Sequence, residues 1–392
     1  MMATRSTRGA IANDFAATDP RGISGSMIRT LLALLCLTPF VAPAHAADEL
    51  SPAAKACFAK PDAGCLATTT VALLESLPAG QQRTLEVFVT LSSFKEVIYA
   101  PSAEPLFRRA AALLPDAERP AIQAWHAMVN ASSFDAVKQA AAGVASLDDR
   151  VLELCNAAPE LQVAGKAALA AQVGRECRGG LASLDETVRG QAEASLVRHL
   201  ALAGDAAALT PLLENARARD GAEATAALLQ MATDVAAAGQ REVAKGLAGQ
   251  LKAAFYALGA DSRDRLRSSA VRFYALIEDK ETVNRLNPGA GGEPWESFLF
   301  HKAVAEAAKL RRDAATVRKE LEAMGTADPV SRAIYASDFV ELHLAAGDRE
   351  QARRDAEHAL TAALERSGGR PTALAHRLPA VGAAFVALER AR

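Results

Sequence analysis

The chain has 392 residues, of which 44 are lysine or arginine and 46 are aspartate or glutamate, for a formal net charge of −2. This near-neutral balance argues against a nucleic-acid-binding protein, since that class is usually strongly basic. Hydrophobic residues make up 50% of the chain and aromatic residues only 5%, so alanine and leucine must form the core. Both favour helices, and no clear β-hairpin pattern occurs, so an all-α fold is predicted.

Residues 27–46 have the pattern of a secretory signal peptide. Arg29 is the charged end, residues 31–37 form the apolar run, and residues 44–46 (Ala-His-Ala) are a small-residue cleavage site. The apolar run is shorter than the roughly 20 residues needed to cross a bilayer, although a retained anchor is the alternative. We therefore expect export to the periplasm or the medium, with no membrane insertion after cleavage.

The position of this signal suggests that translation starts at Met27, with cleavage after Ala46. Residues 1–26 are polar and unpatterned, and we interpret them as a disordered extension or a mis-called start. Residues 1–46 hold four arginines and two aspartates, so the chain from Ala47 onward has a formal charge of −4.

Four cysteines follow the signal peptide, and an even number in an exported protein favours disulfides. Cys57 and Cys65 lie symmetrically about Pro61. A helix that ends before this proline and another that starts after it would bring the two side chains within bridging distance. The sequence therefore predicts a Cys57–Cys65 disulfide.

Cys155 and Cys177 are nearly symmetric about Gly165 and would pair if two antiparallel helices meet at this glycine. The alternative is one helix from Pro159 to Cys177, which would hold the two sulfurs roughly 25–30 Å apart. None of the four cysteines has the spacing of a zinc site, so no metal is predicted.

The stretch 338–363 has the pattern of a helical hairpin. Apolar residues recur at spacings of three and four on both sides of a break at Gly347 and Asp348, which is typical of two amphipathic helices. Gly347 would end the first helix and Asp348 would cap the second. The predicted buried faces contain Phe339, Leu342, His343 and Ala346, then Ala352, Ala356, Ala359 and Leu360.

Similar turns recur along the chain. Successive intervals between them are 39, 35, 40, 34 and 34 residues. A period near 34 with two helices per unit is typical of stacked helical hairpins. The turns are placed at Gly165, Gly204, Gly239, Asp279, Asp313 and Gly347.

This pattern resembles the tetratricopeptide repeat, most closely in residues 331–363, although His343 stands where that family usually has a tyrosine. The resemblance implies a right-handed α-solenoid with a concave groove lined by the first helix of each hairpin. On that helix Ser337 and Glu341 are the candidate partner-binding residues. An irregular α-helical bundle is the alternative fold.

The expected domain organisation follows from these repeats. Residues 47–149 form an N-terminal helical region and residues 150–286 form tetratricopeptide-like repeats. The Pro/Gly-rich segment 287–294 is a linker. Residues 295–392 form C-terminal repeats that end in a capping helix from Pro379.

No HExxH, GxSxG, phosphate-loop or dinucleotide-binding motif is present, so neither catalytic residues nor a cofactor are predicted. The favoured hypothesis is an exported, non-catalytic scaffold that binds a protein or peptide in the cell envelope. One alternative is a helical accessory domain of a cell-wall or envelope enzyme complex. The other is an unrecognised enzyme, which would gather His126 and His199 with carboxylates. The sequence leaves the oligomeric state open.

Overall fold

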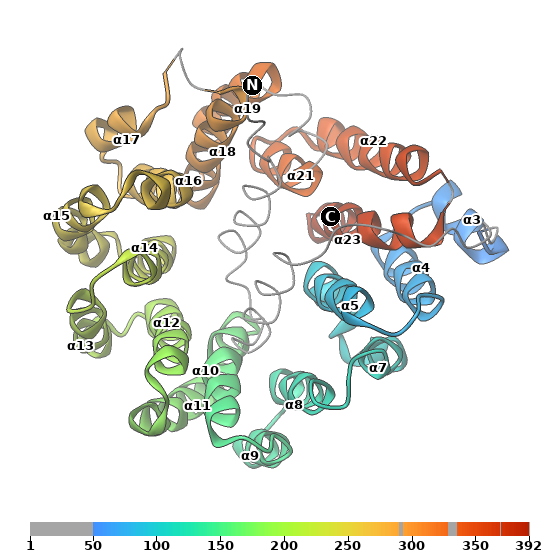
Figure 1. The fold of residues 1–392 in the computed structure, drawn as a ribbon, viewed down its shortest axis with the longest axis horizontal. Helices are drawn as coiled ribbons and strands as arrows, with labels where there is room; N and C mark the ends of the chain where they lie inside the picture. The colour runs from blue at the N-terminus through green and yellow to red at the C-terminus, as the bar shows by residue number, and fades with distance from the viewer. Residues whose placement is uncertain (1–49, 290–292, 328–334, 369, 392) are drawn as a thin grey trace, which may run out of the picture. The chain divides into compact units, whose positions relative to one another are not determined.

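A computed structural model describes residues 50–289, 293–327, 335–368 and 370–391. Helix is the only regular structure in these residues, which confirms the predicted all-α class. The predicted signal peptide and the segment before it lie outside the described residues. In chain order the helices are α3 (Pro52–Ala59), α4 (Ala63–Glu75), α5 (Gln81–Ser93), α6 (Lys95–Ile98), η1 (Pro101–Ala103), α7 (Glu104–Ala112), α8 (Arg119–Asn130), α9 (Phe134–Ala142), α10 (Leu147–Val163), α11 (Ala167–Gly180), η2 (Leu181–Ser183), α12 (Glu186–Ala203), α13 (Ala206–Arg217), α14 (Ala222–Ala237), α15 (Arg241–Ala257), α16 (Ala260–Leu276), α17 (Lys280–Leu286), α18 (Pro294–Leu310), α19 (Ala314–Ala327), α21 (Ala336–Ala345), α22 (Arg349–Ser367) and α23 (Pro371–Arg390) (Figure 1).

The helices group into two compact units. Unit 1 holds residues 120–287, and unit 2 joins the described residues before 120 to those after 287. The boundary at Asn287 and Pro288 falls inside the predicted linker. The predicted region 47–149, in contrast, is divided between the two units.

Six helical hairpins share one turn geometry. In each hairpin a residue with positive φ follows the first helix. The residue after it donates its backbone N–H to the carbonyl five positions before itself, as Asp348 does to His343. This pattern satisfies carbonyls that the helix end would otherwise leave unpaired. In the two turns predicted around Asp279 and Asp313, the left-handed residue is the one just before the aspartate, Glu278 or Arg312. The six residues are Gly165, Gly204, Gly239, Glu278, Arg312 and Gly347.

Aspartates start the second helix in four of these hairpins. Each carboxylate accepts a hydrogen bond from the backbone N–H three residues further on, which satisfies one free donor of the helix start. The cap predicted at Asp348 is confirmed, with 2.9 Å between Oδ1 and the Gln351 nitrogen. The other three caps are Asp205, Asp279 and Asp313.

In unit 1 the first helices of successive hairpins pack on each other in the order α10, α12, α14 and α16. Each also packs on its own second helix, respectively α11, α13, α15 and α17 (Figure 1). Small and medium side chains fill these interfaces, including Ala170, Leu196, Leu229 and Ala270, all fully buried. This arrangement places the same face of each first helix in one row.

In unit 2 the hairpin of α21 and α22 has the predicted buried faces, except that His343 is only half-buried. Phe339 and Leu342 are buried in a cluster with Phe298, Val317 and Met324. On α22 the alanines and the leucine predicted to face inward are also buried. The two-helix pattern read from residues 338–363 is therefore confirmed.

The last helix of the chain differs from the predicted cap. It begins at Pro371 instead of Pro379, and Pro379 lies inside it. Helix α23 packs on α21 and α22 and also on α4 and α5, so both its sides are covered. The contact is close, because a Cβ added at Gly382 would overlap the Phe94 ring.

Candidate functional site

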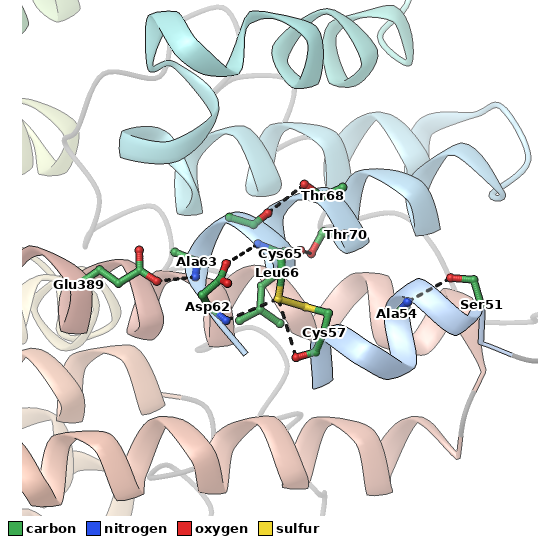
Figure 2. Close-up of a disulfide and its surroundings, with 11 residues drawn as sticks. Ser51, Ala54, Cys57, Asp62, Ala63, Cys65, Leu66, Thr68, Thr70 and Glu389 are labelled. Carbon is green, nitrogen blue, oxygen red and sulfur yellow. Dashed lines mark hydrogen bonds between the residues drawn. A yellow bond between two sulfur atoms is a disulfide. The ribbon is translucent and has the colours of Figure 1, made fainter. Parts of the chain in front are cut away.

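Both predicted disulfides are present. Cys57 and Cys65 are bonded across the turn between α3 and α4, with their Cα atoms 5.7 Å apart (Figure 2). Cys155 on α10 is bonded to Cys177 on α11, with a Cα separation of 5.0 Å. The single-helix alternative is therefore wrong, since Pro159 lies inside α10 and the chain reverses at Gly165. The second disulfide ties together the two helices of the hairpin that begins the row in unit 1.

A polar stripe runs along the first helices of unit 1. Nine residues before each left-handed turn residue stands an uncharged polar side chain, and five or six residues before it stands a charged one. The charges alternate in sign from α10 to α16. We call this set the polar ladder; it consists of Asn156, Ser195, Gln230 and Ser269 with Glu160, Arg198, Asp234 and Arg272.

Neighbouring residues of the polar ladder contact each other across helices. The Ser195 hydroxyl donates to Oδ1 of Asn156 at 2.6 Å. Nη1 of Arg198 lies 3.4 Å from Oε1 of Glu160, and these side chains keep 21% and 10% of their surface exposed. The first two of these helices, α10 and α12, are thus joined by polar contacts where many helix pairs would use apolar side chains.

Asp234 is the half-buried centre of the ladder. Its burial raises the pKa of the carboxyl group to about 6, because a charged carboxylate is poorly solvated there. Arg198, a hydrogen bond from Gln230 and then Arg272 act in the opposite direction and favour the charged form. The carboxyl group therefore lies between cationic groups of both neighbouring helices.

Two buried amide atoms beside this row lack a hydrogen-bond partner within the part of the chain that the structure describes. They are Nδ2 of Asn156, a donor, and Oε1 of Gln191, an acceptor. Gln191 precedes Ser195 by one helical turn, so both lie on one face of α12. An unpaired buried polar group costs roughly 1–3 kcal/mol.

The candidate partner-binding residues Ser337 and Glu341 belong to α21 in unit 2, outside the polar ladder of unit 1. Ser337 is half-buried, and Glu341 forms an ion pair with Lys309 of α18. The adjacent Asp338 lies 3.3 Å from the buried Lys302. Burial raises the pKa of Asp338, Lys302 lowers it, and Glu306 and Glu341 raise it further. The role of Ser337 and Glu341 in partner binding stays a prediction.

The histidines of the enzyme hypothesis lie on separate helices, His126 on α8 and His199 on α12, and both are buried. His199 packs on α11, where a Cβ at Gly174 would lie 2.6 Å from its Nε2. Burial is the larger of two causes that lower the pKa of His199, and the positive charge of Arg178 lowers it further.

Three other histidines lie next to carboxylates in unit 2, which no sequence spacing indicated. The pairs are His301 with Glu320 at 2.6 Å, His343 with Asp355 at 3.3 Å, and His376 with Glu86 at 2.5 Å.

In the residues that the structure describes, no three histidine, cysteine or acidic side chains gather closely enough to hold a metal ion. Within the same residues no helix has the length and apolar character needed to cross a bilayer. No family model, no curated protein and no solved structure matches this chain.

The polar ladder was not predicted from the sequence, although a signal for it is present. Its charged members stand 38, 36 and 38 residues apart, at a nearly constant distance before the turns. Aligning the chain on the turns and not on the buried alanines would have shown these columns. The buried alanines carry the helical period, so the repeats were aligned on them.

Proposed function

We propose that this protein is a non-catalytic scaffold that binds a polypeptide along the first helices of unit 1. The observation behind this proposal is the polar ladder, whose half-buried charges recur on the first helices of four successive hairpins. A row of equivalent sites at regular spacing suits a linear partner, because each hairpin adds one contact without a deep pocket.

Export is the second part of the proposal. Two disulfides in a chain of modest charge suit an oxidising compartment, since such bonds rarely persist in the cytosol. The signal pattern at residues 27–46, with cleavage after Ala46, supports the periplasm or the medium. We also place the hairpins in a tetratricopeptide-like class, supported by the shared turn geometry and by intervals of 34–39 residues between left-handed turn residues.

A random-peptide display library tests the binding function across many partner sequences at once. The purified full chain, with both disulfides intact, is the target, and the Asp234→Arg variant is the counter-target. We expect peptides to be enriched on the wild-type chain and lost on the variant. Arg285→Gln, which changes an exposed ion pair with Glu281 on α17, is the matched control and should retain them. Enrichment that is absent, or equal on all three proteins, would refute the proposal.

A further inference from the structure

The two disulfides differ in their access to solvent. Cys155 and Cys177 are fully buried, each with 0% of its surface exposed. They join α10 and α11, which pack on each other, and α10 also packs on α12. In the bond between α3 and α4, Cys57 is 7% exposed, but Cys65 is only half-buried and keeps contact with solvent. A reagent in solution therefore reaches the Cys57–Cys65 bond more easily than the other.

Helix α3 has few contacts besides its disulfide. It is eight residues long, and Ala54 and Cys57 are its only buried residues. Of the helices that the structure describes, α4 is the one on which α3 mainly packs (Figure 2). A helix shorter than roughly 12–15 residues is marginal in water without such support. The position of α3 therefore depends on the Cys57–Cys65 bond.

Helix α4 does not depend on this bond in the same way, because it also packs on α5, α7 and α23. Its first turn has further contacts of its own. The N–H of Ala63 donates to the Glu389 carboxylate of α23 at 2.8 Å, and Asp62 accepts from the backbone N–H of Cys65 at 2.6 Å (Figure 2). Breaking the disulfide should therefore free α3 and leave the start of α4 in place.

We propose that the Cys57–Cys65 disulfide is a thiol–disulfide exchange site, at which an external dithiol reversibly detaches α3 from α4. An oxidised thiol reagent reverses the reaction and restores the bond. This inference goes beyond the proposed function, since it concerns unit 2 and needs no polypeptide bound to the polar ladder. Exposed disulfides exchange more readily than buried ones, so the Cys155–Cys177 bond keeps a structural role.

The exchange takes place in two steps. One thiolate of the dithiol attacks Sγ of Cys65, the more accessible sulfur, so that a mixed disulfide forms and Cys57 leaves as a thiolate that takes up a proton. The second thiolate of the reagent then attacks its own sulfur in the mixed disulfide and releases Cys65, which is also protonated. The reagent is oxidised to a disulfide, and the protein gains two electrons and two protons. The N–H of Asp62, 3.5 Å from Sγ of Cys65, is a hydrogen-bond donor for the released sulfur.

Timed reduction of the full, folded chain tests the exchange. The oxidised chain is incubated with dithiothreitol without denaturant, quenched with acid and alkylated, and the linked peptides are quantified by mass spectrometry. We expect the Cys57–Cys65 bond to be reduced at least about tenfold faster than the Cys155–Cys177 bond. Equal rates, or earlier loss of the buried bond, would overturn the proposal. With excess glutathione, a monothiol, the mixed disulfide should be trapped on Cys65, and trapping mainly on Cys57 would refute the proposed point of attack.

Hydrogen exchange measured by mass spectrometry tests the release of α3. We expect the amides of α3 to lose their protection in the reduced chain and in the double variant Cys57→Ser/Cys65→Ser, while those of α4 keep theirs. Oxidised glutathione should restore the bond and the protection of α3 in the wild-type chain. The matched control Cys155→Ala/Cys177→Ala should keep α3 protected. Protection of α3 that survives loss of the bond, or its loss together with that of α4, would overturn the selective release of α3.

Discussion

The guanidinium of Arg198 on α12 lies 3.4 Å from the carboxylate of Glu160 on α10, so an ion pair joins two neighbouring hairpins of unit 1. The two residues are separated by 38 positions in the chain. Because both side chains are mostly buried, this pair should contribute more than the usual exposed ion pair, whose median contribution is about 0–1 kcal/mol.

Replacing one partner of this pair should therefore destabilise the protein. We expect Arg198→Gln to lower the free energy of unfolding by roughly 1–2 kcal/mol, since it leaves Glu160 half-buried without its cation. Urea unfolding followed by circular dichroism measures this loss. The control Arg285→Gln, in an exposed pair on α17, should cost less than about 0.5 kcal/mol. Equal effects of the two substitutions would show that the ladder pair adds nothing beyond surface electrostatics.

The pH dependence of stability should report Asp234. Its pKa is about 6 in the folded chain against 3.8 ordinarily, so the folded state keeps a proton that the unfolded state releases between these values. Stability should therefore decrease as the pH rises from about 4 through about 6, and the loss should be complete only above the folded-state pKa. In Asp234→Asn this part of the slope should disappear. An unchanged slope in urea unfolding of the variant would assign the pH dependence to other groups.

Loss of the Cys155–Cys177 disulfide should weaken the first hairpin of the row. The two cysteines are separated by 22 residues, and a loop of that length corresponds to a stabilisation of about 3 kcal/mol in the chain-entropy description. The double variant Cys155→Ala/Cys177→Ala should lose about this amount. Mass mapping of non-reduced peptides should show both linked pairs. Free thiols at all four positions in protein recovered from an oxidising compartment would contradict the assignment.

A non-glycine residue in the left-handed backbone conformation is a site where substitution by glycine should stabilise the protein. Arg312 has a φ of 61°, a conformation that costs a non-glycine residue roughly 1–2 kcal/mol. Arg312→Gly should therefore raise the free energy of unfolding by about 1 kcal/mol. The reverse change at the equivalent turn, Gly347→Ala, should lower it by a similar amount. Thermal unfolding of the two variants gives the comparison, and a destabilised Arg312→Gly would mean that the arginine side chain has contacts of greater value.

Local features of the fold were predictable from sequence. The helical period, the turns at Gly165 and Gly204, the cap at Asp348 and the Cys57–Cys65 disulfide follow from spacing within a few tens of residues. Spacing left the Cys155–Cys177 disulfide open between a hairpin and a single helix, and the turn at Gly165 decides for the hairpin. The turns next to Asp279 and Asp313 were also predicted, but the left-handed conformation of Glu278 and Arg312 was not, because residue type indicates this conformation mainly at glycine.

Long-range features were not predictable in the same way. The polar ladder depends on the register between hairpins, and ordinary surface residues have the same composition. The packing of α23 on α4 and α5 brings together segments that are far apart in the sequence. The periodicity within each segment does not indicate which other segment it will contact. Several contacts fix this packing, including the hydrogen bond from the Ala63 N–H to the Glu389 carboxylate at 2.8 Å (Figure 2).

This pairing of early and late helices constrains how the protein is made. Leu66 and Leu74 of α4 are fully buried in the finished molecule, yet residues 371–390 that cover this helix are translated only after the whole of unit 1. During synthesis the α3–α7 segment therefore keeps apolar surface exposed until α23 is made, although the residues of unit 1 have all been translated by then. Such intermediates attract chaperones and aggregate easily. A ribosome that stops before α23 would release a chain in which one unit is whole and the other has no means of closing.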